Sequence, residues 1–200
     1  MTLEPLLGRI AACEICRDHL PLGPKPLLKV APEVRVLVIG QAPGRLAHVS
    51  GVPWDDPSGN RLRDWLGISS ETFYEHPGLG LMPMGFCYPG TGQGGDLAPR
   101  PECAETWHEE LLASMPHLET TVLIGRYAQL AYLPETADKR AAKKRSVTEV
   151  VRAWQETFPR ILPLPHPSPR NNRWLRNNPW FEAEVLPALR DRVSALLAGK

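Results

Sequence analysis

The chain has 200 residues, of which 42% are hydrophobic and 22% are charged, and its formal net charge is +1 at pH 7 with histidine neutral. This length suits one domain, residues 1–200, with a substantial core, and the small net charge excludes a global basic field, so nucleic-acid contacts require local patches. No stretch approaches the roughly 20 apolar residues of a membrane span, and residues 1–10 lack the apolar core of a secretory signal. We therefore expect a cytoplasmic monomer with no membrane partner.

Strand-like and helix-like patterns alternate along the chain. A β-branched run at residues 34–39, which ends at Gly40, predicts a buried parallel strand. Three further strands are predicted at residues 79–86, where Pro83 interrupts the pattern, 120–124 and 160–164. Helices are predicted at residues 60–66, 105–115, 126–132, 147–157 and 179–197, and Ser146 with Glu149 forms a capping box for the fourth. The alternation predicts a three-layer α/β/α sandwich with a central, mainly parallel four-stranded sheet.

Unusual sequence follows two of the predicted strands. Residues 40–44 read Gly-Gln-Ala-Pro-Gly, and residues 166–171 read His-Pro-Ser-Pro-Arg-Asn. Sites in parallel sheets lie at the carboxyl ends of the strands. We therefore expect the functional site between these two loops.

Four cysteines stand in two pairs in loop-like sequence. Cys13 and Cys16 form a C-x-x-C, and Cys87 and Cys103 follow some seventy residues later among prolines and glycines. Four thiolates can enclose a zinc ion or an iron–sulfur cluster, which would hold the N-terminal segment against the middle of the chain. Four unrelated thiols are the alternative, and structural disulfides are disfavoured because the chain shows no secretory signal.

Two clusters of basic residues are candidate patches for nucleic acid. One comprises Lys139, Arg140, Lys143, Lys144 and Arg145, and the other Arg170, Arg173 and Arg176. A run of charges is usually a solvated face, and this interpretation stays open for the first cluster.

The two loops, taken with the cysteines, resemble the uracil-DNA glycosylase superfamily. Residues 40–44 are similar to the Gly-Glu-Ala-Pro-Gly motif of the family-four, iron–sulfur enzymes, and residues 51–54, Gly-Val-Pro-Trp, to their Gly-x-Pro-Phe. Residues 166–171 resemble the second motif of the superfamily, in the form found in its single-strand-selective branch. The cysteine spacing is similar to that of the family-four cluster ligands. The resemblance implies a base-excision repair enzyme that hydrolyses the N-glycosidic bond of uracil or a related deaminated base in DNA.

The resemblance also assigns roles to residues of the base pocket. His166 would donate a hydrogen bond to the base, on which negative charge develops as the glycosidic bond breaks. Trp54 would stack on the flipped base, although packing in the core is an open alternative for this side chain. In the first loop, the residues expected to contact the base are Gly40, Ala42, Pro43 and Gly44, whose glycines let the backbone approach a ligand closely.

DNA contacts and a cofactor follow from the same resemblance. Ser168 would bind a phosphate, Arg170 and Asn171 would sit where the family inserts a wedge into the duplex, and Arg173 would add charge beside them. Trp174 would add a stacking surface. The four cysteines would hold a [4Fe–4S] cluster, with zinc or no metal as the alternatives that spacing alone leaves open.

The chain departs from the family pattern at the residues that activate water and read the base. Ala42 and Gln41 stand where family-one and family-four motifs carry an acid, and the acidic pair that follows is replaced by Ala47 and His48. Asp56 is then the candidate general base, with His48 as a second candidate and Gln41 as the residue that orients the water.

A further departure concerns the residue that reads the base. Pro83 replaces the asparagine that reads uracil in family four, and Asn60 is the candidate substitute for its amide. Because rejection of a wrong base depends on polar groups left unpaired, a different deaminated or damaged base is an alternative to uracil as the substrate. Two other functions remain open: a catalytically weak protein that binds damaged or single-stranded DNA, and an enzyme acting on a free nucleoside.

Overall fold

A four-stranded, all-parallel sheet forms the centre of the molecule. The computed structural model describes residues 3–134 and 145–198. Strand β1 (Val36–Ile39) lies between β2 (Leu79–Leu81) and β5 (Thr120–Ile124), and β6 (Ile161–Leu164) pairs with the outer side of β5, in the order β2-β1-β5-β6. The register pairs Val38 with Val122 and Val122 with Leu162. All four strands therefore end at the same edge of the sheet.

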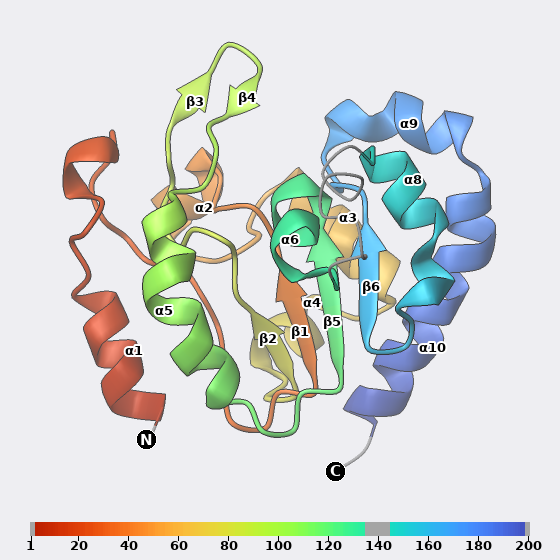
Figure 1. The fold of residues 1–200 in the computed structure, drawn as a ribbon, viewed down its shortest axis with the longest axis horizontal. Helices are drawn as coiled ribbons and strands as arrows, with labels where there is room; N and C mark the ends of the chain where they lie inside the picture. The colour runs from red at the N-terminus through yellow and green to blue at the C-terminus, as the bar shows by residue number, and fades with distance from the viewer. Residues whose placement is uncertain (1–2, 135–144, 199–200) are drawn as a thin grey trace.

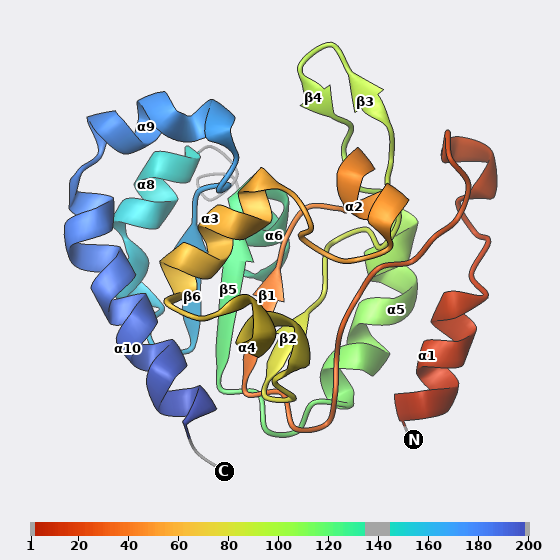
Figure 2. The same ribbon diagram turned by 180° about the vertical axis from the view of Figure 1, so that it is seen from behind.

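Helices cover both faces of this sheet, so the predicted three-layer sandwich is confirmed. Val36 and Val38 face a core formed with α3 (Pro57–Leu66) and α10 (Leu186–Leu197), whereas Leu37 and Ile39 face a core formed with α1 (Leu3–Ala11), α5 (Pro101–Ala113) and α6 (Gly125–Tyr132). Figure 1 shows α5 and α6 in front of the strands, and Figure 2 shows α3 and α4 (Ser70–Glu75) in front of them from behind. Alternating strand residues thus bury both faces, as expected of a parallel sheet.

The predicted elements are present, but several have different ends. The strand predicted at 79–86 is regular only over β2, although Met82 N still donates to Val38 O (2.9 Å) and Met84 N to Gly40 O (2.8 Å) across Pro83, which has no N–H. The helix predicted at 147–157 ends as α8 (Val147–Arg152), and the capping box of Ser146 and Glu149 is confirmed. The helix predicted at 179–197 begins with a π-helical turn, η4 (Phe181–Val185), before α10.

Several short elements are not predicted from the sequence. They are the helices α1, α2 (Arg45–Ser50), α4 and α9 (Asn172–Asn177), the 3-10 turns η1 (Arg17–His19), η2 (Trp154–Glu156) and η3 (Pro169–Asn171), and an antiparallel hairpin of β3 (Thr91–Gly92) and β4 (Gly95–Asp96). Most are too short to show a hydrophobic period. The hairpin extends beyond the carboxyl ends of the sheet strands (Figure 1).

The first basic cluster lies mostly outside the described residues, which do not include Lys139, Arg140, Lys143 and Lys144. Arg145 donates to the backbone oxygen of Glu149 (3.3 Å).

Across residues 3–134 and 145–198, no helix has the length and apolar character needed to cross a membrane.

A buried histidine of α5 contacts α6 and the chain after β2. His108 is 3% exposed, stacks on Phe86 with ring centroids 5.4 Å apart, and its Nδ1 lies 2.5 Å from the Tyr132 hydroxyl. Burial lowers the pKa of His108 to about 4, against an opposing contribution from the backbone of Pro83. The same desolvation raises the pKa of Tyr132 to about 12. Both side chains are therefore neutral in the folded protein at pH 7.

This histidine should make folding stability depend on pH. Because its folded-state pKa lies below the unfolded value of about 6.5, unfolding takes up a proton between about pH 6.5 and 4, and about 3 kcal/mol of stability should be lost as the pH falls through that range. The double variant His108→Phe with Tyr132→Phe avoids leaving an unpaired hydroxyl. Its free energy of unfolding should fall less steeply as the pH falls, because unfolding takes up as much as one proton fewer than in the wild type. Urea denaturation at a series of pH values measures the free energy of unfolding. The same dependence on pH in the wild type and the double variant would exclude the role assigned to His108.

Candidate active site

A cavity opens at the carboxyl ends of the strands, where the two unusual loops meet. It contains about 1290 Å³ of empty space, its open mouth included. Its walls come from the loop after β1, the segment before α3, the β3–β4 hairpin and the loop after β6. The predicted residues that line it are Gly40, Gln41, Ala42, Pro43, Gly44, Trp54, Asp56, His166, Ser168, Arg170 and Asn171.

Trp54 has a backbone conformation that only its surroundings make possible. Its φ is 58°, a left-handed value that costs an aromatic residue of order 1–3 kcal/mol. The Trp54 carbonyl accepts hydrogen bonds from Arg63 Nη1 (3.5 Å) and the Tyr74 hydroxyl (3.3 Å), and a Cβ on Gly59 would lie 1.7 Å from that carbonyl oxygen. These contacts stabilise a conformation that directs the indole toward the first loop.

The indole fills the space that a side chain on Gly40 would need. A Cβ on Gly40 would lie 2.7 Å from Trp54 Cζ2, closer than any real contact. On its other side the indole faces the imidazole of His166, with ring centroids 5.9 Å apart and planes tilted by 31°. Trp54 thus bridges the loops after β1 and β6, and it also packs against the apolar core formed with α3. Packing against the core is therefore confirmed for Trp54, whereas stacking on a flipped base stays a prediction.

The hydrogen bonds of His166 determine where its proton lies. The backbone N–H of Ser168 donates to His166 Nδ1 (3.1 Å), so Nδ1 is an acceptor. Burial lowers the pKa of His166, and the negative charges of Asp56 and Asp96 oppose this only in part. A neutral imidazole whose Nδ1 accepts must carry its proton on Nε2. The ring therefore has one N–H donor available, beside the face of Trp54.

Two side chains hold the loop that carries His166. Asn171 Nδ2 donates to the His166 carbonyl (2.7 Å). Arg61 of α3 donates from Nη1 to the carbonyls of Pro167 and Ser168 (3.2 Å each) and from Nη2 to Asn172 Oδ1 (2.8 Å). The sequence analysis did not identify Arg61, because nothing in a single arginine on a helix indicates a partner about a hundred residues away.

Gln41 and Arg170 hold the β3–β4 hairpin at the mouth of the cavity. Gln41 Nε2 donates to Leu97 O (2.9 Å), and Arg170 Nη1 donates to Gly94 O (2.8 Å). Gly95 has a φ of 129°, and a Cβ there would lie 2.2 Å from Arg170 Nη1. Both polar side chains are thus engaged with backbone oxygens of the segment 94–97.

The hairpin brings a carboxylate that the sequence analysis missed. Asp96 lines the cavity, as does Asp56, whose Oδ1 accepts from Gly59 N (2.7 Å) as the N-cap of α3. A Cβ on Gly44 would lie 3.4 Å from Asp96 Oδ2 and 3.7 Å from Asp56 Oδ2. The glycine-rich run at 90–96 was a signal for a tight hairpin, but its contact with the site depends on the tertiary fold.

Other predicted residues lie outside the cavity. Asn60 is exposed on α3, and its amide oxygen accepts from Arg63. Arg173 is exposed on α9 and is not among the lining residues. His48 is buried in α2, while Trp174 packs into the core and donates to Thr148 Oγ1 (2.7 Å). Pro83 lines the cavity at the place where the family pattern has its asparagine.

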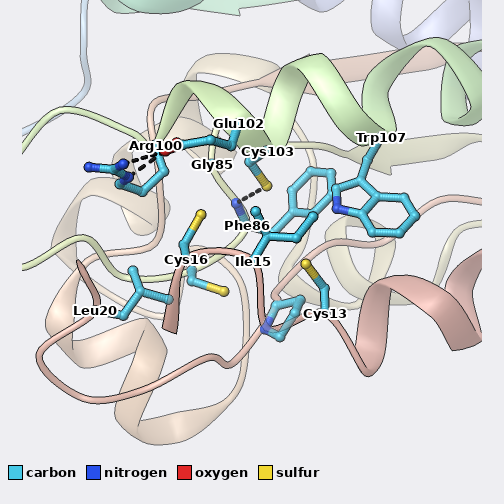
Figure 3. Close-up of a pocket in the computed structure, with 12 residues that line it drawn as sticks. Cys13, Ile15, Cys16, Leu20, Gly85, Phe86, Arg100, Glu102, Cys103 and Trp107 are labelled. Carbon is cyan, nitrogen blue, oxygen red and sulfur yellow. Dashed lines mark hydrogen bonds and ion pairs between the residues drawn. The ribbon is translucent and has the colours of Figure 1, made fainter. Parts of the chain in front are cut away.

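A second pocket is lined by all four cysteines. Cys13 follows α1, Cys16 precedes η1, Cys87 follows the extension of β2, and Cys103 lies in the first turn of α5. Figure 3 shows the sulfur atoms of Cys13, Cys16 and Cys103 turned toward one shared space. The pocket contains about 410 Å³ of empty space, part of it open to solvent. No three His, Cys, Asp or Glu side chains of residues 3–134 and 145–198 are arranged to hold a metal ion.

The lining of this pocket combines partly buried thiols with N–H donors. Phe86 N donates to Cys103 Sγ (3.3 Å), and the Trp107 indole N–H is buried without a hydrogen-bond partner. Burial raises the pKa of Cys103 to about 12 and raises the pKa values of Cys16 and Cys87, so protons must leave when thiolates bind a metal. The pocket therefore combines four thiol groups with a backbone amide that donates to sulfur.

Comparison with known families identifies one that covers most of the chain. The family model described as the uracil DNA glycosylase superfamily matches residues 29–190. That range contains the central sheet, both strand-end loops and the β3–β4 hairpin. The chain therefore belongs to the uracil-DNA glycosylase superfamily.

Proposed function

We propose that the protein is a monofunctional DNA glycosylase that removes uracil or a related deaminated base by hydrolysis and leaves an abasic site. Membership of the superfamily supports a hydrolase of the DNA glycosylase class. The observation that carries the proposal is the neutral His166, whose free Nε2–H stands beside the face of Trp54 in the cavity. Lysine is absent from the described residues that line the cavity, which favours a monofunctional enzyme over one that forms a Schiff base.

The mechanism follows from where charge develops. A flipped base would lie in the cavity against Trp54, whose indole is seated over Gly40. As the glycosidic bond breaks, electron density moves to the base oxygen, and the N–H of His166 stabilises it more strongly than in the ground state. Because His166 is neutral, it donates without transferring its proton outright. Ser168 and Asn171 would contact the DNA backbone next to the cavity, and Arg173 on α9 would contribute charge at longer range.

A diverged DNA-binding protein remains the second candidate because of Pro83. This residue lines the cavity without an amide to read the base edge, and Asn60 points elsewhere, toward Arg63. A gel assay separates the two candidates. Purified protein is incubated with single- and double-stranded oligonucleotides that carry uracil, hypoxanthine or xanthine, and abasic sites are cleaved with alkali. Cleavage establishes the glycosylase and its base, whereas DNA binding without cleavage supports the second candidate.

His166→Ala should reduce the single-turnover excision rate by about 10²–10³-fold, the cost of losing one donor to a developing anion. Binding to the same oligonucleotide should change little, since the donor acts mainly in the transition state. His117→Ala is the matched control, because this histidine lies in a different pocket between α5 and β5. Full activity of the His166 variant would remove the assigned role.

We also propose that Cys13, Cys16, Cys87 and Cys103 hold a [4Fe–4S] cluster with a structural role. When bound, such a group would join the N-terminal segment to the start of α5 and to the chain after β2. The unpartnered Trp107 N–H and the Phe86 amide support this proposal, because each can donate to sulfur.

Cys13→Ser should lower both the iron content and the melting temperature of anaerobically purified protein. The control is Ala12→Ser, which adds a hydroxyl at the neighbouring exposed position. Elemental analysis for iron and zinc also decides between the two metals. Equal metal content and equal melting temperature in both variants and the wild type would contradict the cluster.

A further inference from the structure

We infer that Asp96, on the β3–β4 hairpin, is the carboxylate that activates the attacking water, and that Arg170 positions it. The inference rests on the proposed glycosylase function and supplies the acid that the first loop lacks. Ala42 and Gln41 provide no carboxylate, and Gln41 is already bonded to Leu97 O. Among the described residues that line the cavity, Asp56 and Asp96 are the acidic ones.

The two carboxylates converge on one point of the first loop. Asp96 Oδ2 and Asp56 Oδ2 lie 3.4 Å and 3.7 Å from the position that a Cβ on Gly44 would take. The absence of a side chain on Gly44 leaves room there for a water between the two oxygens. Both carboxylates also act on His166 through their negative charge. They therefore stand near the group that would bind the departing base.

The hydrogen bonds of the two residues assign them different tasks. Asp56 Oδ1 accepts from Gly59 N (2.7 Å) and caps α3, so this carboxylate is fixed and partly neutralised by the helix N-terminus. From the part of the chain that the structure describes, Asp96 Oδ1 accepts a single hydroxyl contact, from Thr91 (3.2 Å), and Thr91 Oγ1 also contacts the Tyr88 hydroxyl (2.5 Å). Asp96 is thus the carboxylate that is free to take a water proton, because it does not cap a helix, and Asp56 orients the same water.

The proposed step is a hydrolysis. The water oxygen bonds to the sugar C1′ while the bond from C1′ to the base nitrogen breaks and its electron pair leaves on the base. Asp96 takes one proton from the water and returns it to solvent, and the released base anion takes a proton from solvent. The two carboxylates also stabilise the positive charge that develops on the sugar in such transition states.

Arg170 acts through the hairpin in this arrangement. Its guanidinium donates to Gly94 O (2.8 Å) and occupies the space where a Cβ on Gly95 would lie. The residue next to Gly95 is Asp96, so this contact determines how far the carboxylate reaches into the cavity. Arg170 is therefore a positioning residue rather than a wedge between base pairs.

The test begins with Asp96→Asn, in which the amide oxygen can still accept from Thr91. Its single-turnover excision rate should fall by about 10²-fold or more, while its affinity for the DNA should stay equal or rise, since a negative charge near phosphates has been removed. The matched control is Asp191→Asn, an exposed aspartate of α10. An Asp96→Asn rate within twofold of the wild type, or a loss confined to affinity, would overturn the inference.

A double-mutant cycle tests the role of Arg170. At saturating DNA, Arg170→Ala should lower the rate in the wild-type background and add little further loss to Asp96→Asn, because both changes disable the same carboxylate. Additive losses would show that Arg170 acts independently of Asp96. If the wild-type protein releases none of the tested bases, the proposed function itself fails, and the inference with it. If the wild-type protein releases a base and Asp96→Asn releases it at the same rate, the inference about Asp96 fails while the proposed function stands.

Discussion

The parallel register of β1, β5 and β6 is the constraint on which the site depends. β1 and β6 are not neighbours, because β5 lies between them, yet all three strands end at the same edge. The loops at 40–44 and 166–171 are therefore held about two strand spacings apart, roughly 10 Å. That distance leaves a gap which neither loop can close by itself.

Trp54 closes this gap, and its conformation shows how local strain is offset by the fold. Its left-handed backbone is held by Arg63 and Tyr74, and the absence of side chains on Gly40 and Gly59 makes room for its indole and its carbonyl. A residue strained in this way persists only where its neighbours over-determine it. The cavity wall is consequently stiff on the side of Trp54, whereas the opposite wall is a two-stranded hairpin fastened by side-chain hydrogen bonds.

The sequence predicted those parts of the fold and site that depend on neighbouring residues. The strands, the capping box at Ser146 and the convergence of the two loops follow from hydrophobic runs, local spacing and the geometry of parallel sheets. The contributions of Arg61 and Asp96 could not be predicted, since both depend on contacts between segments distant in the chain. Asn60 was misplaced for a related reason: it lies near Trp54 in sequence, but the turn of α3 directs it toward Arg63.

One stretch of backbone connects the two pockets. The amides of Met84 and Gly85 donate to Gly40 O and Gln41 O (2.8 and 3.0 Å), and the next amide, that of Phe86, donates to Cys103 Sγ (3.3 Å). Of these three consecutive amides, the first two are therefore anchored to the loop that lines the cavity and the third to the cysteine pocket. A change in the covalent state of Cys103, such as its oxidation, alters the acceptor of the Phe86 amide, three residues from Pro83 in the cavity wall. The chemistry of sulfur in this protein is thus coupled through the backbone to the shape of the cavity at the strand ends.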